Sequence, residues 1–195
     1  MRKYLPVLVL FVAAFTIGIV GFQAYRDKQM ASGEESPYGG AFKLVSMNGS
    51  EITDQSLRGN PSVVFFGYTH CPVVCPTTLF DLDSWLKELG PEGAAIRGYM
   101  VTVDPERDTP EYIQKYITNV SDRITGITGD PKDIAAMLKS YNIYAKKVDE
   151  DGENYTMDHT ASILLLDKNG RLRSTIAYGE PSETAISKLK RLAAG

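Results

Sequence analysis

Both cysteines of the chain lie in one short stretch, Ser62 to Pro76, which reads SVVFFGYTHCPVVCP. The stretch opens with β-branched and aromatic residues that predict a buried strand, and apolar residues recur at helical spacing after Pro76. Cys71 and Cys75 are therefore expected where a strand turns into a helix. Because a helix N-terminus carries unpaired amides and partial positive charge, it favours thiolates, and both thiols are primed to react or to bind a metal.

The spacing of the two cysteines permits more than one use. Residues four apart meet on one face of a helix, so Cys71 and Cys75 can chelate one soft ion or close a small disulfide. Their Cys-x-x-x-Cys pattern differs from the Cys-x-x-Cys of ordinary thiol oxidoreductases. A buried structural pair or a static disulfide is the simpler alternative, and the spacing alone leaves it open.

The length of the chain, 195 residues with 43% hydrophobic content, is enough for one compact domain with a real core. The 21 basic and 24 acidic residues give a net charge of -3. This balance lacks the basic footprint of a nucleic-acid-binding protein, so we expect no nucleic-acid partner.

The first thirty residues are not expected to belong to the core. Residues 4–22 carry no charge, which predicts a single membrane-spanning helix. A cleaved signal peptide is the alternative, but the apolar run is followed by neither a small-x-small cleavage pattern nor a cysteine for lipid attachment. We therefore expect a membrane anchor over residues 1–30, a flexible tether over residues 31–40 and a globular domain over residues 41–195.

The flanks of the apolar run also indicate a location. They lack the Arg- and Ser-rich amphipathic character of an organelle transit peptide. This favours a bacterial protein that crosses the cytoplasmic membrane once and holds its domain on the extracytoplasmic side. There a cysteine pair can cycle between dithiol and disulfide.

The order of predicted elements indicates the fold class. A hairpin over residues 42–53 precedes three alternating strand and helix units, and a hairpin or long loop then ends at Asp158-His159. A strand over residues 162–166, its antiparallel partner over residues 172–177 and a last helix from Pro181 to Leu192 complete the chain. We predict an α/β fold with a mixed, thioredoxin-like sheet flanked by helices on both faces.

His159 is the best candidate for a third metal ligand. It lies just before a predicted strand, and in a thioredoxin-like sheet the loop that enters this strand faces the cysteine turn. Asp158 is the candidate for a hydrogen bond that orients the His159 ring, although it could equally only shape the loop. An ordinary loop role for His159 stays open at this point.

Two thiolates and one imidazole form a soft set of three ligands that suits copper, particularly Cu(I), with one ion per chain. A structural zinc ion would require four ligands. His70 could in principle be the fourth, but its side chain points elsewhere than that of the adjacent Cys71. We interpret His70 as a turn residue or an outer partner of the site.

Three blocks of the sequence carry a resemblance: FGYTHCPVVCP, VTVDPERDTP and YTMDHTASILLLDKNG. Together with a single anchor ahead of them, they resemble the Sco/SenC family of copper-binding, thioredoxin-fold proteins. The resemblance implies that Cys71, Cys75 and His159 bind copper, and that the protein helps to build the dinuclear copper centre of cytochrome c oxidase subunit II. The chain departs from the family at Val73, where an Asp is common, so a negative charge beside the thiolates is absent.

Three hypotheses for the function follow. The first is a membrane-anchored copper metallochaperone with a redox-switchable cysteine pair, partnered by the oxidase subunit and by another copper chaperone or a thioredoxin-like reductant. The second is an enzyme, a thiol-disulfide oxidoreductase that reduces the cysteines of the oxidase subunit through Cys71 and Cys75. The third is a copper or redox sensor.

Overall fold

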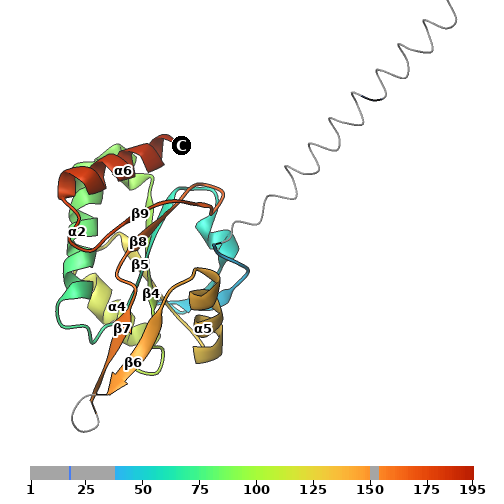
Figure 1. Ribbon diagram of the computed structural model, residues 1–195, viewed down its shortest axis with the longest axis vertical. Helices are drawn as coiled ribbons and strands as arrows, with labels where there is room; N and C mark the ends of the chain where they lie inside the picture. Colours follow the sequence, from blue (N-terminus) through green and yellow to red (C-terminus); the bar gives the residue numbers. More distant parts are fainter. Residues whose placement is uncertain (1–17, 19–37, 150–153) are drawn as a thin grey trace, which may run out of the picture. The chain divides into compact units, whose positions relative to one another are not determined.

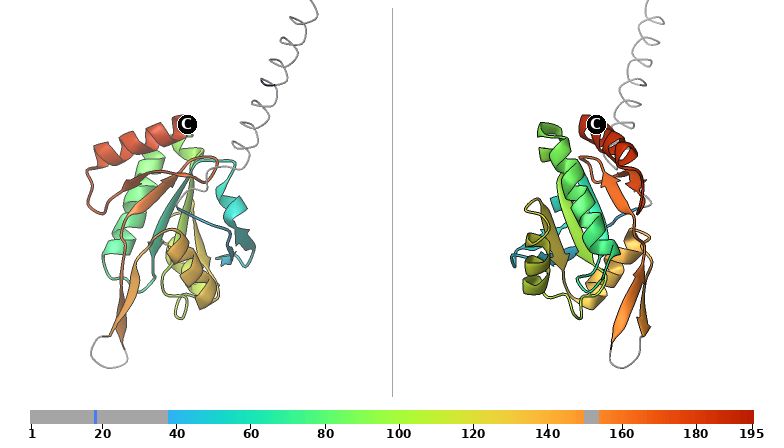
Figure 2. Two further views of the ribbon diagram at one scale, coloured as in Figure 1. Left: turned by 45° about the vertical axis from the view of Figure 1, so that its right-hand side comes forward. Right: turned by 90° about the vertical axis from the view of Figure 1, so that its left-hand side faces the viewer.

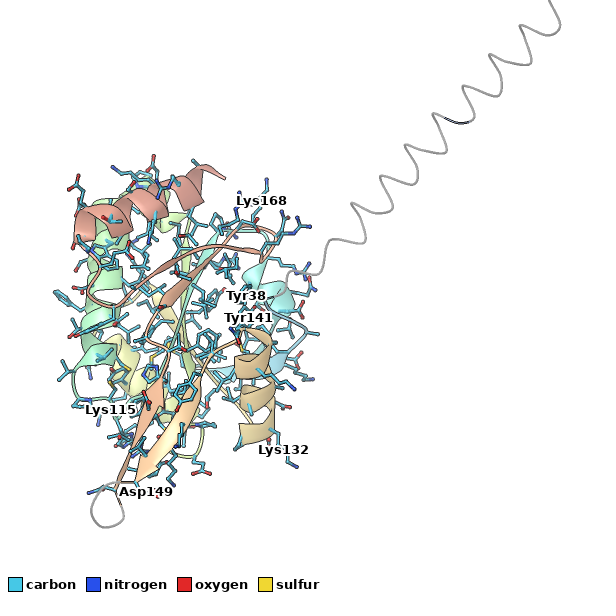
Figure 3. All side chains as sticks on the ribbon, in the orientation of Figure 1. Tyr38, Lys115, Lys132, Tyr141, Asp149 and Lys168 are labelled. Carbon is cyan, nitrogen blue, oxygen red and sulfur yellow. The ribbon has the colours of Figure 1, made fainter. Side chains whose placement is uncertain are left out.

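The computed structural model describes Gly18, residues 38–149 and residues 154–195. The predicted anchor over residues 1–30 and most of the tether over residues 31–40 lie outside these ranges. Within them, no helix has the length and apolar character needed to cross a membrane. Residues 37–195 form one compact unit. At its start the amide of Gly39 donates to the carbonyl of Ser140 over 2.8 Å, in the region where Figure 3 labels Tyr38 and Tyr141.

The centre of this unit is a seven-stranded sheet (Figure 1). Its strands are β1 (Lys43–Ser46), β2 (Glu51–Thr53), β3 (Ser62–Gly67), β4 (Arg97–Thr102), β5 (Ile124–Thr128), β8 (Ile163–Leu166) and β9 (Leu172–Ile176). They lie in the order β2-β1-β5-β4-β3-β8-β9. Strands β3, β4 and β5 are parallel, and the pairs β1–β2, β1–β5, β3–β8 and β8–β9 are antiparallel. The predicted mixed sheet is confirmed.

The helices are η1 (Asp54–Leu57, a 3-10 helix), α2 (Val74–Glu88), α3 (Pro91–Ala94), α4 (Pro110–Thr118), α5 (Pro131–Ser140) and α6 (Ser182–Ala194). They cover both faces of the sheet, as neighbouring residues of β3 show. A Cβ added to Gly67 would meet the sulfur of Cys75 on α2, whereas the ring of Phe66 packs on Tyr141 at the end of α5. Successive side chains of a strand point to opposite faces, so α2 and α5 lie on opposite sides. Helix α6 packs against α2, as Figure 2 shows.

Local sequence explains most of these boundaries. Helix α4 begins at Pro110 because Thr109 caps it, accepting a hydrogen bond from the amide of Tyr112. Helix α2 begins at Val74, earlier than the predicted start after Pro76. The first helical turn tolerates Pro76, because its missing amide would have no partner in the helix there. Cys75 therefore lies inside the first turn, and Cys71 lies before it.

Strands β6 (Ala145–Asp149) and β7 (Tyr155–His159) form a separate two-stranded antiparallel sheet. This hairpin projects from one end of the unit in both views of Figure 2. His159 pairs with Ala145 at the base, and Asp149, labelled in Figure 3, pairs with Tyr155 at the far end. Since side chains alternate along a strand, Tyr155, Met157 and His159 share one face of β7, and Asp158 lies on the other.

Candidate metal centre

The first half of the candidate site is the pair of cysteines, which follows β3, the most buried strand of the domain. Residues Val63 to Phe66 of β3 have no exposed surface, and the chain leaves the sheet after Gly67. The turn that follows is closed by the amide of Cys71, which donates to the carbonyl of Tyr68 over 3.4 Å. The cysteine turn is thus fixed to the core at its strand end and to the first turn of α2 at its other end.

The two cysteines are free thiols with different surroundings. Cys75 is fully buried and Cys71 is partly exposed. The amide of Cys75 donates to the sulfur of Cys71 over 3.3 Å. A hydrogen bond from the thiol of Cys75, helped by His159 and by backbone amides, lowers the pKa of Cys71 to about 4, and burial opposes this shift only in part. The same hydrogen bond, together with burial, raises the pKa of Cys75.

His159, at the end of β7, reaches the sulfur pair from the hairpin. Its Nε2 lies 3.6 Å from the sulfur of Cys75. Its Nδ1 lies 3.0 Å from the carbonyl oxygen of Thr160, an acceptor only, so Nδ1 carries a proton and Nε2 is the nitrogen that faces the sulfurs. The structure therefore brings His159 to Cys75 across 84 positions, and the sulfur of Cys71 lies 3.3 Å from the backbone amide of the same Cys75.

Two aromatic rings enclose the imidazole of His159. Tyr68 meets it edge to face, with centroids 5.7 Å apart and planes at 87°. Phe65 of β3 does the same at 6.2 Å and 69°. Edge-to-face contacts of this kind restrict how a ring can turn. Both walls come from β3 and the residue that follows Gly67, so the segment that carries the cysteines also orients the histidine.

Asp108 ties the cysteine turn to the neighbouring strand. Its carboxylate accepts hydrogen bonds from the amide and the hydroxyl of Thr69, at 3.1 and 2.6 Å, and from the hydroxyl of Thr102 at 2.6 Å. The side chain is fully buried, and this burial raises the pKa of Asp108 against the lowering effect of the two threonines.

His70 lies beside the cysteines without facing them. Its ring stacks on Tyr112, with centroids 5.6 Å apart and planes at 15°. Its Nδ1 lies 3.0 Å from the hydroxyl of Thr69 and 3.8 Å from Asp108. These contacts agree with its interpretation as a turn residue. The carboxylates near it, Asp104 and Asp108, are already engaged by hydroxyl and guanidinium donors.

Asp158 does not orient His159 in the structure. The Nδ1 of His159 is engaged by the backbone of Thr160, whereas Asp158 is exposed and pairs in register with Lys146. Strand alternation is the physical reason, because it points adjacent residues of β7 to opposite faces. Met157, on the same face of β7 as His159, packs against the core.

A second group of contacts at the site was missed from the sequence. Arg107 donates to Asp104 and, over 3.0 Å, to the carbonyl of Tyr155, while the hydroxyl of Tyr155 donates to Asp104 over 2.8 Å. The guanidinium carbon lies 3.6 Å from the centroid of the Tyr155 ring. Arg107 and Asp104 belong to the block VTVDPERDTP, but the sequence gives no sign that they reach a residue 48 positions away.

The arrangement suits one soft metal ion. Two ligands that bind one ion at roughly 2.0–2.3 Å each lie roughly 3.3–4 Å apart. The 3.6 Å between Cys75 and His159 falls in that interval without any movement of the backbone. A thiolate at Cys71 completes a donor set of two sulfurs and one nitrogen.

Comparison with known proteins shows to which family the chain belongs. The model of the family described as SCO1/SenC matches residues 30–194. The chain belongs to this family. The SCO2-like protein RP587 of Rickettsia prowazekii is 35% identical over 152 residues, which is 77% of this chain and 71% of that protein. The mitochondrial SCO1 homolog 1 of Arabidopsis thaliana is 31% identical over 140 residues, 71% of this chain but only 42% of that protein.

A solved structure extends the match to three dimensions. The structure of Bradyrhizobium japonicum ScoI with copper bound superposes with a TM-score of 0.74 and 44% sequence identity, over 80% of this chain and 99% of that one. The thioredoxin-like architecture predicted for the domain is therefore that of its relatives.

Proposed function

We propose that the domain binds one copper ion through Cys71, Cys75 and His159 and carries it as cargo. The observation that supports this most directly is the approach of the His159 imidazole to within 3.6 Å of the Cys75 sulfur, with Cys71 beside it. A set of two thiolates and one imidazole favours Cu(I) over the harder ions. The relative from Bradyrhizobium japonicum, whose structure contains copper, supports the choice of metal.

The destination of the copper is, in this proposal, the dinuclear copper centre of cytochrome c oxidase subunit II. The SCO1/SenC family supports an oxidase-directed copper chaperone. The proposal includes an anchor over residues 1–30, a tether over residues 31–40 and a domain over residues 41–195 on the extracytoplasmic side of a bacterial membrane. The uncharged run over residues 4–22 supports the anchor.

Release of the cargo follows from the redox chemistry of the cysteine pair. Forming the Cys71–Cys75 disulfide takes two electrons from the two thiolates as the ion leaves. These electrons reduce the disulfide of a thioredoxin-like partner, which takes up two protons from solvent and becomes a dithiol. The oxidised pair no longer offers thiolates, so it cannot hold the ion. Reduction by the same class of partner restores the site.

Titration of the reduced protein with Cu(I) in the presence of a competing chelator tests this proposal. Binding is expected to saturate at one ion per chain, and His159→Ala is expected to weaken it by more than about tenfold, because even residues that only support a ligand commonly contribute that much. Asp158→Ala is the matched control, since Asp158 is adjacent but faces away. An affinity that His159→Ala leaves unchanged would remove His159 from the site.

A second candidate function is favoured by the asymmetry of the two thiols. A partly exposed Cys71 with a pKa of about 4 and a buried Cys75 resemble the attacking and resolving cysteines of a thiol-disulfide oxidoreductase. The Cys71 thiolate would attack a disulfide of the oxidase subunit, freeing one of its thiols and forming a mixed disulfide with the other sulfur. Cys75 would then attack the Cys71 sulfur, freeing the second thiol of the subunit and leaving the Cys71–Cys75 disulfide in this chain. Turnover of such a substrate that Cys71→Ser abolishes and His159→Ala leaves intact would favour the enzyme over the chaperone.

A further inference from the structure

The β6–β7 hairpin carries one ligand of the site, yet it is not part of the main sheet. Among the described strands, β6 and β7 hydrogen-bond only with each other as sheet neighbours. Nothing in the backbone ladder therefore fixes the direction of β7 relative to the cysteine turn. The contacts that Tyr155, Met157 and His159 of β7 make with the rest of the domain must supply that constraint.

These three residues make three successive contacts with the rest of the domain. His159 reaches Cys75, and the backbone of Met157 hydrogen-bonds the hydroxyl of Tyr68. Tyr155 makes the third contact, with Arg107. It lies four positions before His159 on the same face, or roughly 13 Å along an extended strand. Contacts at both ends of β7 fix its direction, which a contact at one end would not.

The contact between Tyr155 and Arg107 is the most extensive of the three. The guanidinium stacks over the Tyr155 ring at 3.6 Å and donates to its carbonyl over 3.0 Å. The side chain of Asp104, which is 3% exposed, accepts hydrogen bonds from both the Nε of Arg107 and the hydroxyl of Tyr155. A partly buried cation over an aromatic ring is stabilising, and the carboxylate holds both partners in place.

Arg107 also lies near Tyr68, one of the two aromatic residues that enclose His159. Its guanidinium carbon lies 5.9 Å from the centroid of the Tyr68 ring. The same Tyr68 ring makes the edge-to-face contact with His159. One guanidinium nitrogen, Nη2, is buried and has no hydrogen-bond partner among the described residues.

We propose that Arg107 is a positioning residue that latches the β6–β7 hairpin to the domain and so controls how fast the bound metal ion leaves. With the latch closed, His159 stays against Cys75. When the latch opens, the hairpin can turn away and leave the ion on the two sulfurs, where an acceptor can take it. The metal part of this inference rests on the proposed function, whereas the latch itself does not.

The test compares Arg107→Gln with Lys147→Gln. Both changes remove one positive charge stacked on the Tyr155 ring, but Lys147, 3.7 Å from that ring, belongs to the hairpin itself and pairs with Met157. Each reduced protein is loaded with one equivalent of Cu(I) and mixed with excess chelator. We expect copper loss about tenfold faster for Arg107→Gln, the equivalent of about 1.4 kcal/mol, and within about twofold of wild type for Lys147→Gln.

A readout without copper separates the latch from the proposed function. In the reduced, metal-free protein, Arg107→Gln is expected to speed amide hydrogen exchange about tenfold at residues 155–159 and to leave β3 unchanged. If wild type binds no copper, the proposed function fails, but accelerated exchange in the hairpin would still support the latch. Unchanged exchange, or faster exchange with an unchanged rate of copper loss, would overturn the proposal.

Tyr155→Phe keeps the test valid if Arg107→Gln also loosens β3. It removes only the hydrogen bond to Asp104 and retains the stacked ring, so the core is not disturbed. We expect about threefold faster copper loss and hairpin exchange, a fraction of the value of a hydrogen bond to a charged group. Values equal to wild type in this variant would contradict the latch.

Discussion

The two halves of the site are built in opposite ways. The cysteine turn follows β3, whose central residues are fully buried, and it runs into a helix of fifteen residues. His159 comes from a hairpin outside the main sheet, which contacts with Arg107, Tyr68 and Cys75 hold to the domain. A rigid half can keep two sulfurs ready, and a detachable half can complete or open the coordination. This division suits a protein that must hold a metal ion tightly and still release it.

The largest expected difference between the two halves is in local stability. Amides of β3 at Val63 to Phe66 should exchange with solvent only on global unfolding, whereas those of β7 should exchange through local opening of the hairpin. We expect exchange in β7 to be at least about a hundredfold faster in the reduced protein. Equal protection of the two strands, measured by NMR, would show that the hairpin is as firmly held as the core.

The second prediction concerns the reactivity of Cys71. Its pKa of about 4 lies below the ordinary 9.0, so the thiolate is almost fully formed at pH 6 and above. Alkylation of Cys71 should therefore change little between pH 6 and pH 8, where an ordinary thiol becomes about tenfold more reactive per pH unit. A rate that climbs throughout this range would contradict the assigned environment.

Cys75→Ala provides the control for that profile. The hydrogen bond from the Cys75 thiol is the main cause of the low pKa of Cys71, so removing it should raise the pKa toward 9.0 and restore the climb with pH. His159→Ala removes a weaker cause and should raise the pKa less.

The third prediction tests the rigidity of the cysteine half. A methyl group at Gly67 would lie 2.6 Å from Cε1 of Phe65 and 3.0 Å from the sulfur of Cys75. Gly67→Ala is therefore expected to lower the free energy of unfolding by about 1–3 kcal/mol, as overpacked cores do. At Gly40 the nearest atom, Cβ of Ser140, would be at an ordinary 3.5 Å, so Gly40→Ala is the matched control. Equal denaturation midpoints would argue that the turn yields easily.

The smallest effect is expected at Val73, which is 58% exposed beside Cys71. Val73→Asp places a carboxylate near the Cys71 thiolate, and repulsion should raise the pKa of Cys71. Because the position is solvated, we expect a rise of only a few tenths of a unit. An alkylation profile between pH 3 and pH 6 measures it, and a fall in the pKa would contradict the expected repulsion.

The sequence predicted much of the fold because its signals are local. Val63 to Phe66 form a continuous apolar run, Thr109-Pro110 is a helix start, and the Gly of Asn48-Gly49 adopts the φ of +82° that its turn requires. The two unpredicted helices, η1 and α3, have four residues each, too short for a periodic apolar pattern.

The candidate site was predictable only in its ligand types. The sequence motifs identified Cys71, Cys75 and His159 as candidate ligands, and in the structure Cys75 contacts both of the others. The supporting contacts could not be found, because Asp108 holds Thr69 across 39 positions and Arg107 reaches Tyr155 across 48. Adjacency in sequence was also misleading at Asp158, since the extended strand turns it away from the ring of its neighbour.

The central claim is that the rigid pair Cys71 and Cys75 and the imidazole of His159, which belongs to a separate hairpin, bind the same copper ion. X-ray absorption at the copper edge, recorded on the reduced protein loaded with one equivalent of Cu(I), tests it most directly. The account predicts two sulfur neighbours and one imidazole nitrogen per copper, with the imidazole signal lost in His159→Ala. A spectrum with sulfur ligands only, identical in the two proteins, would contradict it.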